Sequence, residues 1–575
     1  MRWAALAVFI LLVASFAWLL YSGYEARSEL RAIRQDVGTL QKQISAGQID
    51  DARQTASRIQ SEANAAHSHT TGPVWAIGAG VPWLGRPLDS ARHLSTAVDA
   101  VADHTLPALV DATHVLSPGV LRDPQGRFNL SAIARLAGPV SDAGDGLDAA
   151  LAELAATPSN TWFGSVNTAR ADLISDLTPL RDTVTNLGRA IKVVPTVLGA
   201  QGPRRYMITF ANDAEIRGTD GIAGAFVIAR ADKGMVTFDT AKADNYLVGT
   251  RAKGVDLGSS YYGLYQGAAK DYRDSTWSPN FPSVAKIWAS MWQQKTGQTL
   301  DGSLVLDPTA LGYLLAVTGP VTVDGDTAIT SQNVVQYTQQ GLYEQYPSLQ
   351  QNDARKRFLL DLADAVSASI LSPKVDLAGL LHAAGQGAVE HRLMFYSKDS
   401  PVERQVAAVS LGGTLPAQSV PFVGIDLTNE SQSKLDYYLH ARLDVRRTGC
   451  GATRDVIATL TLANDSPSDL PKYVIGNSGS HRTETLDVTV LGSEGTKFRQ
   501  VQADGRTPFH STGADDNHPG YTALFVPIKQ GGTVQIVFSM TQPAGHGPLV
   551  VRAQPMINPM TTSVEDATCG TTSTS

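Results

Sequence analysis

The chain begins with a long uncharged stretch. Residues 3–21, WAALAVFILLVASFAWLLY, contain no Asp, Glu, Lys or Arg. At about 1.5 Å rise per residue, a helix of this length spans the roughly 30 Å hydrocarbon core of a bilayer. A cleaved signal peptide, the alternative, has a shorter apolar region of about 7–15 residues before its cleavage site. We therefore predict an uncleaved anchor, with residues 1–24 forming a cytoplasmic tip and a transmembrane helix.

The two cysteines of the chain, Cys450 and Cys569, both lie late in the sequence. A pair at the two ends of one C-terminal region indicates a disulfide, which requires an oxidising compartment. Two unrelated buried thiols are the alternative. Arginines directly follow the uncharged stretch, so a count of positive charges alone would give the opposite orientation. The cysteines lead us to predict a single-pass protein of the cell membrane with the bulk of the chain extracytoplasmic.

The rest of the chain changes its periodicity twice. At about 150 residues per domain, its 575 residues suggest three or four units. Residues 25–198 are rich in Ala and Leu at helical spacing, as at Leu30, Ile33, Val37, Leu40 and Ile44. We predict an α-helical stalk or bundle there. It acts either as a spacer through which the protein oligomerises, or simply packs on itself and on the next domain.

Two further domains are expected after this stalk. Residues 199–405 alternate short apolar runs such as YMITF with amphipathic helices such as FPSVAKIWASMWQQKTG, which indicates an α/β domain. Residues 406–575 alternate apolar and polar residues between regular turn signals, which is typical of a β-sandwich, and end in a frayed tail. The predicted fold class is thus multidomain: transmembrane helix, helical stalk, central α/β domain and C-terminal β-sandwich.

Several function classes find no support in the sequence. The net charge is −7 and no basic block is present, so we expect no nucleic-acid partner. The sequence has no G-x-S-x-G, H-E-x-x-H, P-loop or G-x-G-x-x-G motif. The HSH triplet at 67–69 lacks carboxylate or cysteine company and is a weak metal signal.

Charged residues gather at the ends of the expected elements of the α/β domain. They are Glu215, Arg217, Asp220, Asp244, Arg355 and Arg357. Guanidinium groups suit phosphate or pyrophosphate, and nearby carboxylates could hold a Mg²⁺ that bridges the same phosphates. Alternatively, Glu215 and Arg217 form a structural ion pair, and Arg355 and Arg357 lie on a solvated helix face. Spacing alone favours this second interpretation.

The sequence resembles the actinobacterial family called domain of unknown function 4012 over about residues 25–555. The resemblance rests on FANDAEIRGTDGIAGAF, DSTWSPNFPSVAKIW, LDGSLVLDPTALGYLLAVTGPVTVDG and KLDYYLHARLDV…LTLANDSPSDLPKYV. The family's opening motif, N-x-x-E-x-R-x-x-G-G, is matched by Asn212, Glu215, Arg217 and Gly221. Asp220 stands where the first glycine of the pair is usual.

The α/β domain also resembles, more distantly, the LytR–CpsA–Psr phosphotransferases, which attach lipid-linked glycopolymers to the bacterial cell wall. RGTDG, DGSLVLDPTALGYLLAVTGPVTV and NDARKRFL are similar to three of their motifs. AKADNYL keeps Asp244, but Ala243 replaces an arginine expected there. The resemblance implies a LytR–CpsA–Psr-like α/β fold and a polyprenyl-pyrophosphate glycan as ligand, in cell-wall or exopolysaccharide assembly.

Two hypotheses follow. In the first, a cell-envelope phosphotransferase binds and transfers the lipid-linked glycan. Glu215 then orients Arg217, the arginines Arg217, Arg355 and Arg357 hold the pyrophosphate, and Asp220 and Asp244 bind Mg²⁺ or act as catalytic base. In the second, the protein is a non-catalytic scaffold or a glycan- or protein-binding module of the envelope, with a degenerate α/β domain.

Overall fold

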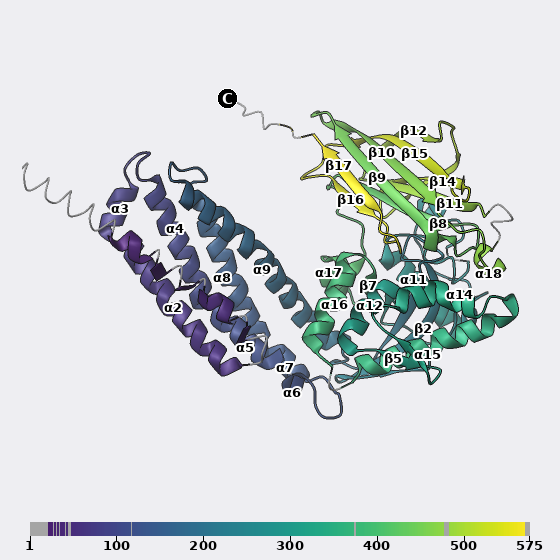
Figure 1. Ribbon diagram of the computed structural model, residues 1–575, viewed down its shortest axis with the longest axis horizontal. Coiled ribbons are helices and arrows are strands. Elements are labelled where there is room, and N and C mark those ends of the chain that lie inside the picture. The colour runs from purple at the N-terminus through teal and green to yellow at the C-terminus, as the bar shows by residue number, and fades with distance from the viewer. Residues whose placement is uncertain are drawn as a thin grey trace, which may run out of the picture. The chain divides into compact units, whose positions relative to one another are not determined.

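The computed structural model describes residues 21–567 and 569, except 27, 30, 31, 34, 41, 44–47, 117, 269, 373–374 and 477–481. The chain forms two compact units, residues 1–196 and 197–575. We call them the helical unit and the α/β–β unit. Figure 1 shows the helices of the first and the sheets of the second.

The helical unit consists of helices that run alongside one another in alternating directions (Figure 1). They are α2 (Ile49–Thr71), α3 (Pro73–Ala79), α4 (Arg86–Ala100), the π-helical turn η1 (Val101–Thr105), α5 (Leu106–Leu116), α6 (Pro118–Leu121), α7 (Leu130–Arg135), α8 (Ala137–Ala156) and α9 (Gly164–Val197). Leucines of α4, α8 and α9, including Leu94, Leu147 and Leu177, share one buried core. The apolar stripe of each helix is thus buried against its neighbours.

The structure corrects the first element of the predicted fold class, the transmembrane helix. None of the helices in the described part of the chain combines the length and the apolar character needed to cross a membrane. The stretch for which a transmembrane helix was predicted, residues 3–21, lies outside the described residues except for Tyr21. Leu30 and Ile44 of the expected stalk pattern also lie outside them. The described fold is that of a multidomain protein with helices and several sheets.

The α/β–β unit starts with a five-stranded sheet in the order β3-β2-β1-β4-β7. Its strands are β1 (Arg204–Asn212), β2 (Ile222–Asp232), β3 (Met235–Phe238), β4 (Gly302–Leu306) and β7 (Leu393–Ser397). The strands β1 and β4 are parallel, and the other neighbours are antiparallel. Because β1 and β4 run the same way, both end at the same edge of the sheet. The site described below lies at this edge.

Helices cover both faces of this sheet. Side chains of α11 pack on Met207 and Phe226, whereas α12, α15 and α16 pack on the opposite face around Ile208 and Leu306. The neighbours Met207 and Ile208 point to opposite faces, as the alternation of a strand requires. The helical elements of this part are η2 (Asp244–Tyr246), α10 (Ser259–Leu264), α11 (Phe281–Thr296), α12 (Pro308–Thr318), α13 (Val334–Gln336), η3 (Tyr337–Gly341), α14 (Leu342–Gln345), η4 (Leu349–Gln351), α15 (Asn352–Ile370), α16 (Leu377–Val389), α17 (Ser400–Val406) and η5 (Ser410–Gly412), with the hairpin β5 (Val321–Val323) and β6 (Thr327–Ile329).

Two more five-stranded sheets complete the unit, in the orders β12-β15-β10-β9-β17 and β13-β14-β11-β8-β16. They enclose one core to which Leu443 and Leu460 contribute from the first sheet and Ile425 and Val488 from the second. The elements are β8 (Phe422–Asn429), η6 (Leu435–Tyr438), β9 (Leu439–Thr448), β10 (Thr453–Asn464), α18 (Lys472–Ile475), β11 (Glu484–Gly492), β12 (Lys497–Ala503), β13 (Phe509–Asp515), β14 (His518–Ile528), β15 (Thr533–Pro543), β16 (Val550–Ala553) and β17 (Thr561–Asp566). In β9, inward and outward residues alternate as expected for a strand with one buried face.

A disulfide joins Cys450 to Cys569, which confirms the predicted pairing. Cys450 follows β9 and Cys569 follows β17, and these two strands are parallel neighbours at the edge of their sheet. The bond therefore ties the last strand to the rest of the sheet.

The turn between β1 and β2 connects the central sheet to the β sheets. The amide of Ile216 donates to the carboxylate of Asp436 (2.8 Å), and the carbonyl of Ile216 accepts from the amide of Asn429 (3.0 Å). The side chain of Ile216 is buried in the core between the two β sheets. The charged turn 212–221 is therefore fixed by the C-terminal half of the unit.

Candidate functional site

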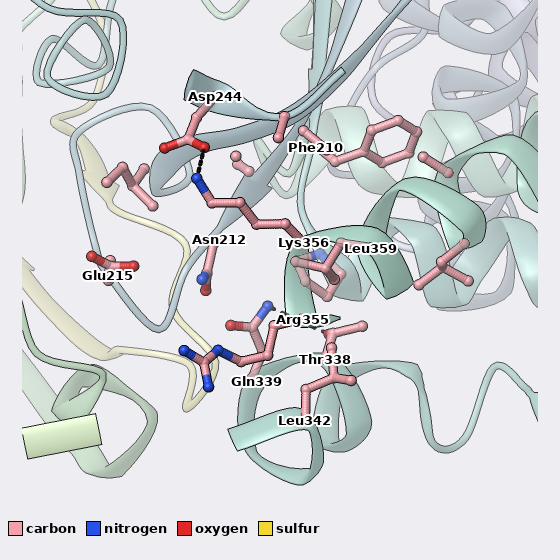
Figure 2. A pocket seen from close by; sticks show the side chains of 18 of the residues that line it. Phe210, Asn212, Glu215, Asp244, Thr338, Gln339, Leu342, Arg355, Lys356 and Leu359 are labelled. Atoms are coloured by element: carbon pink, nitrogen blue, oxygen red, sulfur yellow. Dashed lines mark hydrogen bonds and ion pairs between the residues drawn. The ribbon is translucent and has the colours of Figure 1, made fainter. Parts of the chain in front are cut away.

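A cavity of about 150 Å³ opens at the edge of the central sheet where β1 and β4 end. Figure 2 shows side chains from β1, the turn after it, η3, α14 and α15 around this cavity. Lys434 and Tyr473 add two side chains from the C-terminal half of the chain. Asp307 caps α12 by accepting from the amide of Ala310 (2.7 Å), which fixes the start of that helix at the cavity wall.

Arg355 forms the cationic part of the wall. Arg355 is only 2% exposed, and its guanidinium carbon lies 3.7 Å from the centre of the Tyr473 ring. One nitrogen, Nη1, donates to the carbonyls of Tyr346 and Ser348 (3.0 Å for the latter). The other two nitrogens, Nε and Nη2, are buried and have no hydrogen-bond partner among the described residues. A buried guanidinium thus keeps two unused donors at the cavity.

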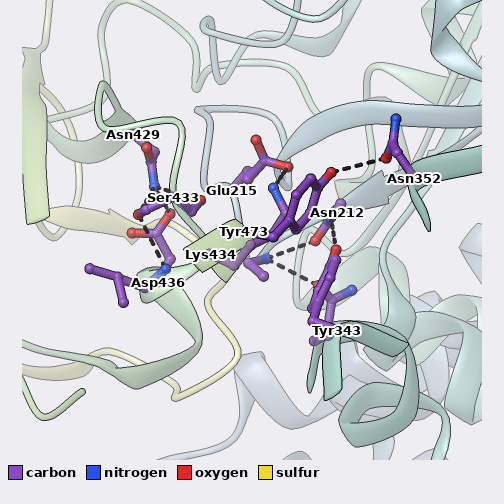
Figure 3. Close-up of polar contacts among 12 residues, drawn as sticks. Asn212, Glu215, Tyr343, Asn352, Asn429, Ser433, Lys434, Asp436 and Tyr473 are labelled. Atoms are coloured by element: carbon purple, nitrogen blue, oxygen red, sulfur yellow. Dashed lines mark hydrogen bonds and ion pairs between the residues drawn. The ribbon is translucent and has the colours of Figure 1, made fainter. Parts of the chain in front are cut away.

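Lys434 and Glu215 form a buried ion pair at the same end (Figure 3). The ammonium group of Lys434 also lies 5.7 Å and 5.2 Å from the ring centres of Tyr343 and Tyr473, which stack on each other. Burial lowers the pKa of Lys434, but Glu215 and the two tyrosines outweigh it and raise this pKa above its ordinary value. Lys434 is therefore held charged, and its charge is balanced by Glu215.

A second ion pair also lines the cavity. Lys356 donates to the carboxylate of Asp244 over 2.7 Å, as Figure 2 shows. The amide of Asn212 donates to the hydroxyl of Tyr343 (3.1 Å) and holds that ring in place. Both lysines of the lining are thus paired with carboxylates, which leaves Arg355 as the cation without one among the described side chains that line the cavity.

Most of the remaining wall is apolar, although Asp307, Thr338, Gln339 and Asn352 also line it. Its apolar members are Phe210, Ala211, Ile222, Ala223, Ala225, Ala243, Leu306, Pro308, Leu311, Leu342, Leu359, Leu362 and Ala363. An apolar lining with a few charged groups at one end is typical of sites for small amphiphilic ligands.

The structure brings three of the predicted site residues to the cavity, Glu215, Asp244 and Arg355. It places Arg217, Asp220 and Arg357 outside the lining. Arg357 lies on the exposed side of α15. Arg355 and Arg357 are therefore not a pair of phosphate-binding groups, because the helix separates them.

The expectation that Glu215 orients Arg217 is wrong. Glu215 binds Lys434, whereas Arg217 is buried and donates to the carbonyl of Ile216 (2.9 Å). Arg217 counteracts the effect of burial on nearby carboxyls of the C-terminal half. Burial raises the pKa of Glu430 to about 7 and that of Asp487 to about 6, and the charge of Arg217 limits both shifts. Two residues apart in a tight turn, the side chains of Glu215 and Arg217 reach different partners.

Asp220 lies in a buried group of acids that also includes Asp307 of the cavity lining. It is 1% exposed, adopts a φ of +57°, and neither of its carboxylate oxygens has a hydrogen-bond partner among the described residues. Burial, followed by the charge of Asp307, raises the pKa of Asp220 well above its ordinary value. Asp307 itself is neutralised by Arg392 over 2.5 Å.

The two acids expected to bind Mg²⁺ do not fit a shared metal site. Asp244 lines the cavity and is engaged by Lys356, while Asp220 is outside the lining. Among the described residues, no group of three or more His, Cys, Asp or Glu side chains is arranged to hold a metal ion.

Sequence reasoning missed Lys434, Tyr343 and Tyr473. Lys434 and Tyr473 do occur in the motifs KLDYYLHARLDV and LPKYV, on which the family resemblance partly rests. The alternation of these segments predicts only that they belong to the C-terminal β region. The signal for a role of Lys434 and Tyr473 in the site is their position inside motifs on which the family resemblance rests.

A model of a known protein family matches a segment that contributes part of this site. Residues 201–343 match the family described as Protein of unknown function (DUF4012). The match confirms the family resemblance over this segment. The matched segment includes Asn212, Glu215, Asp244 and Tyr343, while Arg355, Lys434 and Tyr473 lie beyond it.

Solved structures and curated proteins add little. Lin1025 protein from Listeria innocua is 12% identical with a TM-score of 0.21, and the match covers 37% of this chain and 78% of that one. Protein gbs0355 from Streptococcus agalactiae is 10% identical with a TM-score of 0.24, covering 38% and 76%. Such low TM-scores support no inference about fold or activity. No curated protein matches the chain, and the resemblance to LytR–CpsA–Psr proteins stays a prediction.

Proposed function

We propose that the α/β–β unit binds the pyrophosphate of a polyprenyl-pyrophosphate-linked glycan, as a binding protein of the cell envelope. The observation that supports this most is the guanidinium of Arg355, buried at the cavity with Nε and Nη2 unpartnered. A buried donor without an acceptor costs about 1–3 kcal/mol, which an anionic ligand would recover.

The chemistry of the cavity favours a phosphate-bearing ligand. A planar guanidinium offers parallel donors that match the oxygens of phosphate, and its stacking on Tyr473 holds the plane in one orientation. Since Lys434 and Lys356 are neutralised by Glu215 and Asp244, the charge of Arg355 remains for the ligand.

The apolar wall favours a ligand with a hydrocarbon part. At about 150 Å³, the cavity is smaller than the roughly 300–1,000 Å³ of sites for drug-sized ligands. It suits a pyrophosphate group and the carbons next to it, so the remaining lipid and the glycan would extend beyond it. The disulfide supports an extracytoplasmic location, because such bonds persist in oxidising compartments.

Binding without transfer is the form of the proposal that the geometry favours. Asp220 lies outside the cavity and Asp244 is engaged by Lys356, so neither predicted catalytic acid is free to act as a base at the ligand. This arrangement favours the second hypothesis, a non-catalytic envelope module, over the phosphotransferase.

Titration calorimetry with farnesyl pyrophosphate and with inorganic pyrophosphate tests this function. We expect both to bind, the farnesyl compound more tightly, and Arg355→Met to weaken both at least tenfold. Arg357→Met is the matched control, because Arg357 lies on the same helix outside the cavity. Equal affinity of the Arg355→Met and Arg357→Met variants would overturn the proposal. Steady release of prenyl monophosphate would instead show that the protein is an enzyme.

A further inference from the structure

Exposed apolar side chains cluster at one end of the helical unit. Helix α3 and two loops form this cluster: residues 80–85 between α3 and α4, and residues 157–163 between α8 and α9, which Figure 1 shows at the same end of the bundle. We call it the aromatic tip. It comprises Ile77, Val81, Trp83, Leu84, Trp162 and Phe163, of which Ile77 is 76%, Trp83 62% and Trp162 53% exposed. The rings of Trp83 and Trp162 lie 6.2 Å apart, so the two loops form one surface.

The first loop holds its side chains outward by a fixed backbone. Trp83 adopts a φ of +64°, which is uncommon for a bulky residue. The amide of Gly85 donates to the carbonyl of Val81 (2.8 Å) and closes the loop. A Cβ at Gly85 would lie 2.4 Å from the carbonyl oxygen of Ala79, so glycine permits the close return of the chain.

The second loop is closed by a side chain. The Asn167 amide donates to the carbonyl of Thr161 (2.8 Å), and its oxygen accepts from the amide of Thr161 (2.9 Å). Trp162 and Phe163 follow directly and remain outside this closure. Both loops therefore present large apolar groups to the outside on backbone closed by hydrogen bonds, which is unusual for a surface without a partner.

Charge is nearly absent around the aromatic tip. Residues 72–87 contain Arg86 as their single charged residue, and residues 154–169 contain none. Two segments without carboxylates and with one exposed arginine are compatible with the anionic head groups of a lipid bilayer.

The same end of the unit adjoins the start of the described chain. Trp75 of α3 donates its indole N–H to the hydroxyl of Ser22 (2.8 Å), and Tyr21 and Tyr24 on either side are exposed. The described chain therefore begins beside the aromatic tip.

We propose that the aromatic tip contacts the interfacial region of a lipid bilayer. Tryptophan and tyrosine rings prefer the head-group level of membranes, where one end is apolar and the other polar. The exposed tryptophans, the two loops without carboxylates and the exposed Tyr21 and Tyr24 beside them favour a bilayer over a second copy of the chain or another protein. This inference is independent of the proposed ligand of the α/β–β unit.

The test uses the full chain with vesicles of phosphatidylcholine and phosphatidylglycerol. A single new cysteine carries an environment-sensitive fluorophore, either at the aromatic tip (Ser159→Cys) or at the opposite end of the bundle (Gln125→Cys). Both positions are exposed, and both native cysteines are held in the disulfide. We expect lipids spin-labelled at the head group to quench the fluorophore at 159 severalfold more than the one at 125. Adding Trp83→Ser and Trp162→Ser should reduce this quenching.

Other outcomes would overturn the proposal. These are a full chain that does not float with the vesicles, a fluorophore at 159 that stays unquenched, and equal quenching at both positions. In the absence of lipid, the emission of the fluorophore at 159 could shift to the blue as protein concentration rises. Such a shift would show that a second copy of the chain covers the aromatic tip. Circular dichroism of the Trp83→Ser/Trp162→Ser chain checks that its helices are intact.

Discussion

Arg355 lies above the ring of Tyr473, with 3.7 Å between the guanidinium carbon and the ring centre. The two residues come from α15 and α18, on opposite sides of the boundary between the central sheet and the β sheets. Tyr473 in turn stacks on Tyr343. The cationic end of the cavity therefore exists only when both halves of the α/β–β unit are folded together.

We expect the ring face of Tyr473 to contribute to pyrophosphate binding through its contact with Arg355. Tyr473→Leu removes the cation–π contact, which is worth about 1–2 kcal/mol at a desolvated site, and should weaken pyrophosphate binding about tenfold. Tyr473→Phe keeps the ring and loses only the hydrogen bond from the hydroxyl to Asn352 (3.1 Å), so it should bind nearly as the native chain does. Calorimetry on both variants separates the contribution of the ring to pyrophosphate affinity from that of the hydroxyl. Equal losses of affinity in the two variants would contradict the role of the ring.

The pair Glu215–Lys434 should show strong coupling. Their side chains are 14% and 6% exposed, so Lys434→Met leaves a buried, uncompensated carboxylate and should cost about 3–5 kcal/mol of unfolding free energy. Adding Glu215→Gln to Lys434→Met should recover much of this loss. A double-mutant cycle from urea denaturation measures the coupling, and additive effects would rule out the pair.

Arg217 is expected to stabilise the fold rather than bind a ligand. Because burial raises the folded-state pKa of Glu430 and Asp487 above their ordinary values, stability present at low pH is lost as pH rises through about 6–7. Arg217→Gln removes the cation that limits this loss. It should therefore cost little at pH 5 and about 1–3 kcal/mol at pH 8, with pyrophosphate binding unchanged.

The exposed pair Arg230–Asp239 provides the control for this experiment. Arg230→Gln should change the free energy of unfolding by less than about 1 kcal/mol at either pH. A loss of pyrophosphate binding in the folded Arg217→Gln variant would return Arg217 to the ligand site.

The sequence predicted local elements better than the contacts among their side chains. The run YMITF lies in β1 and FPSVAKIWASMWQQKT forms α11, because apolar periodicity reflects which face of an element is buried. The disulfide was predictable because the chain has only two cysteines. The membrane-spanning helix has no counterpart among the helices of the described residues.

The candidate site was only partly predictable. Glu215, Asp244 and Arg355 were identified because charge at the ends of elements is visible in the sequence. Their partners were not, since Lys434 and Tyr473 reach the cavity only through the docking of the β sheets. Sequence spacing suggested Arg217 as the partner of Glu215, but it contains no information on which element lies across the turn.

The disulfide should be a major source of stability for the last strand. It closes a loop of 119 residues, for which the chain-entropy model gives about 4–5 kcal/mol. Replacing both cysteines by alanine should lower the free energy of unfolding accordingly. Hydrogen exchange should rise first in β17, although Arg447 still binds Asp566 (2.7 Å) across this strand pair. Unchanged exchange in β17 would show that pairing with β9 alone holds the strand.

Asp220 is the position where glycine should stabilise the protein. Its φ of +57° costs a non-glycine residue about 1–2 kcal/mol, while glycine adds about 0.4–1 kcal/mol of unfolded-state entropy. The backbone contribution to Asp220→Gly is therefore a gain of roughly 0.5–1 kcal/mol. Asp324→Gly tests this contribution alone, because Asp324 has a φ of +53° in an exposed turn between β5 and β6.

The buried carboxyl of Asp220 adds a pH-dependent part to this gain. Burial and the charge of Asp307 raise its folded-state pKa, so its contribution to stability falls as pH rises above the unfolded-state value. A variant without this carboxyl does not lose this part of its stability as pH rises. The gain from Asp220→Gly should thus exceed that from Asp324→Gly and grow between pH 5 and pH 8, whereas the gain from Asp324→Gly stays constant. The charges of Arg392 and Arg552 act on Asp220 and oppose the rise of its pKa. Destabilisation by Asp220→Gly at pH 8 would mean that its carboxylate is charged in the folded protein and balances one of these two arginines.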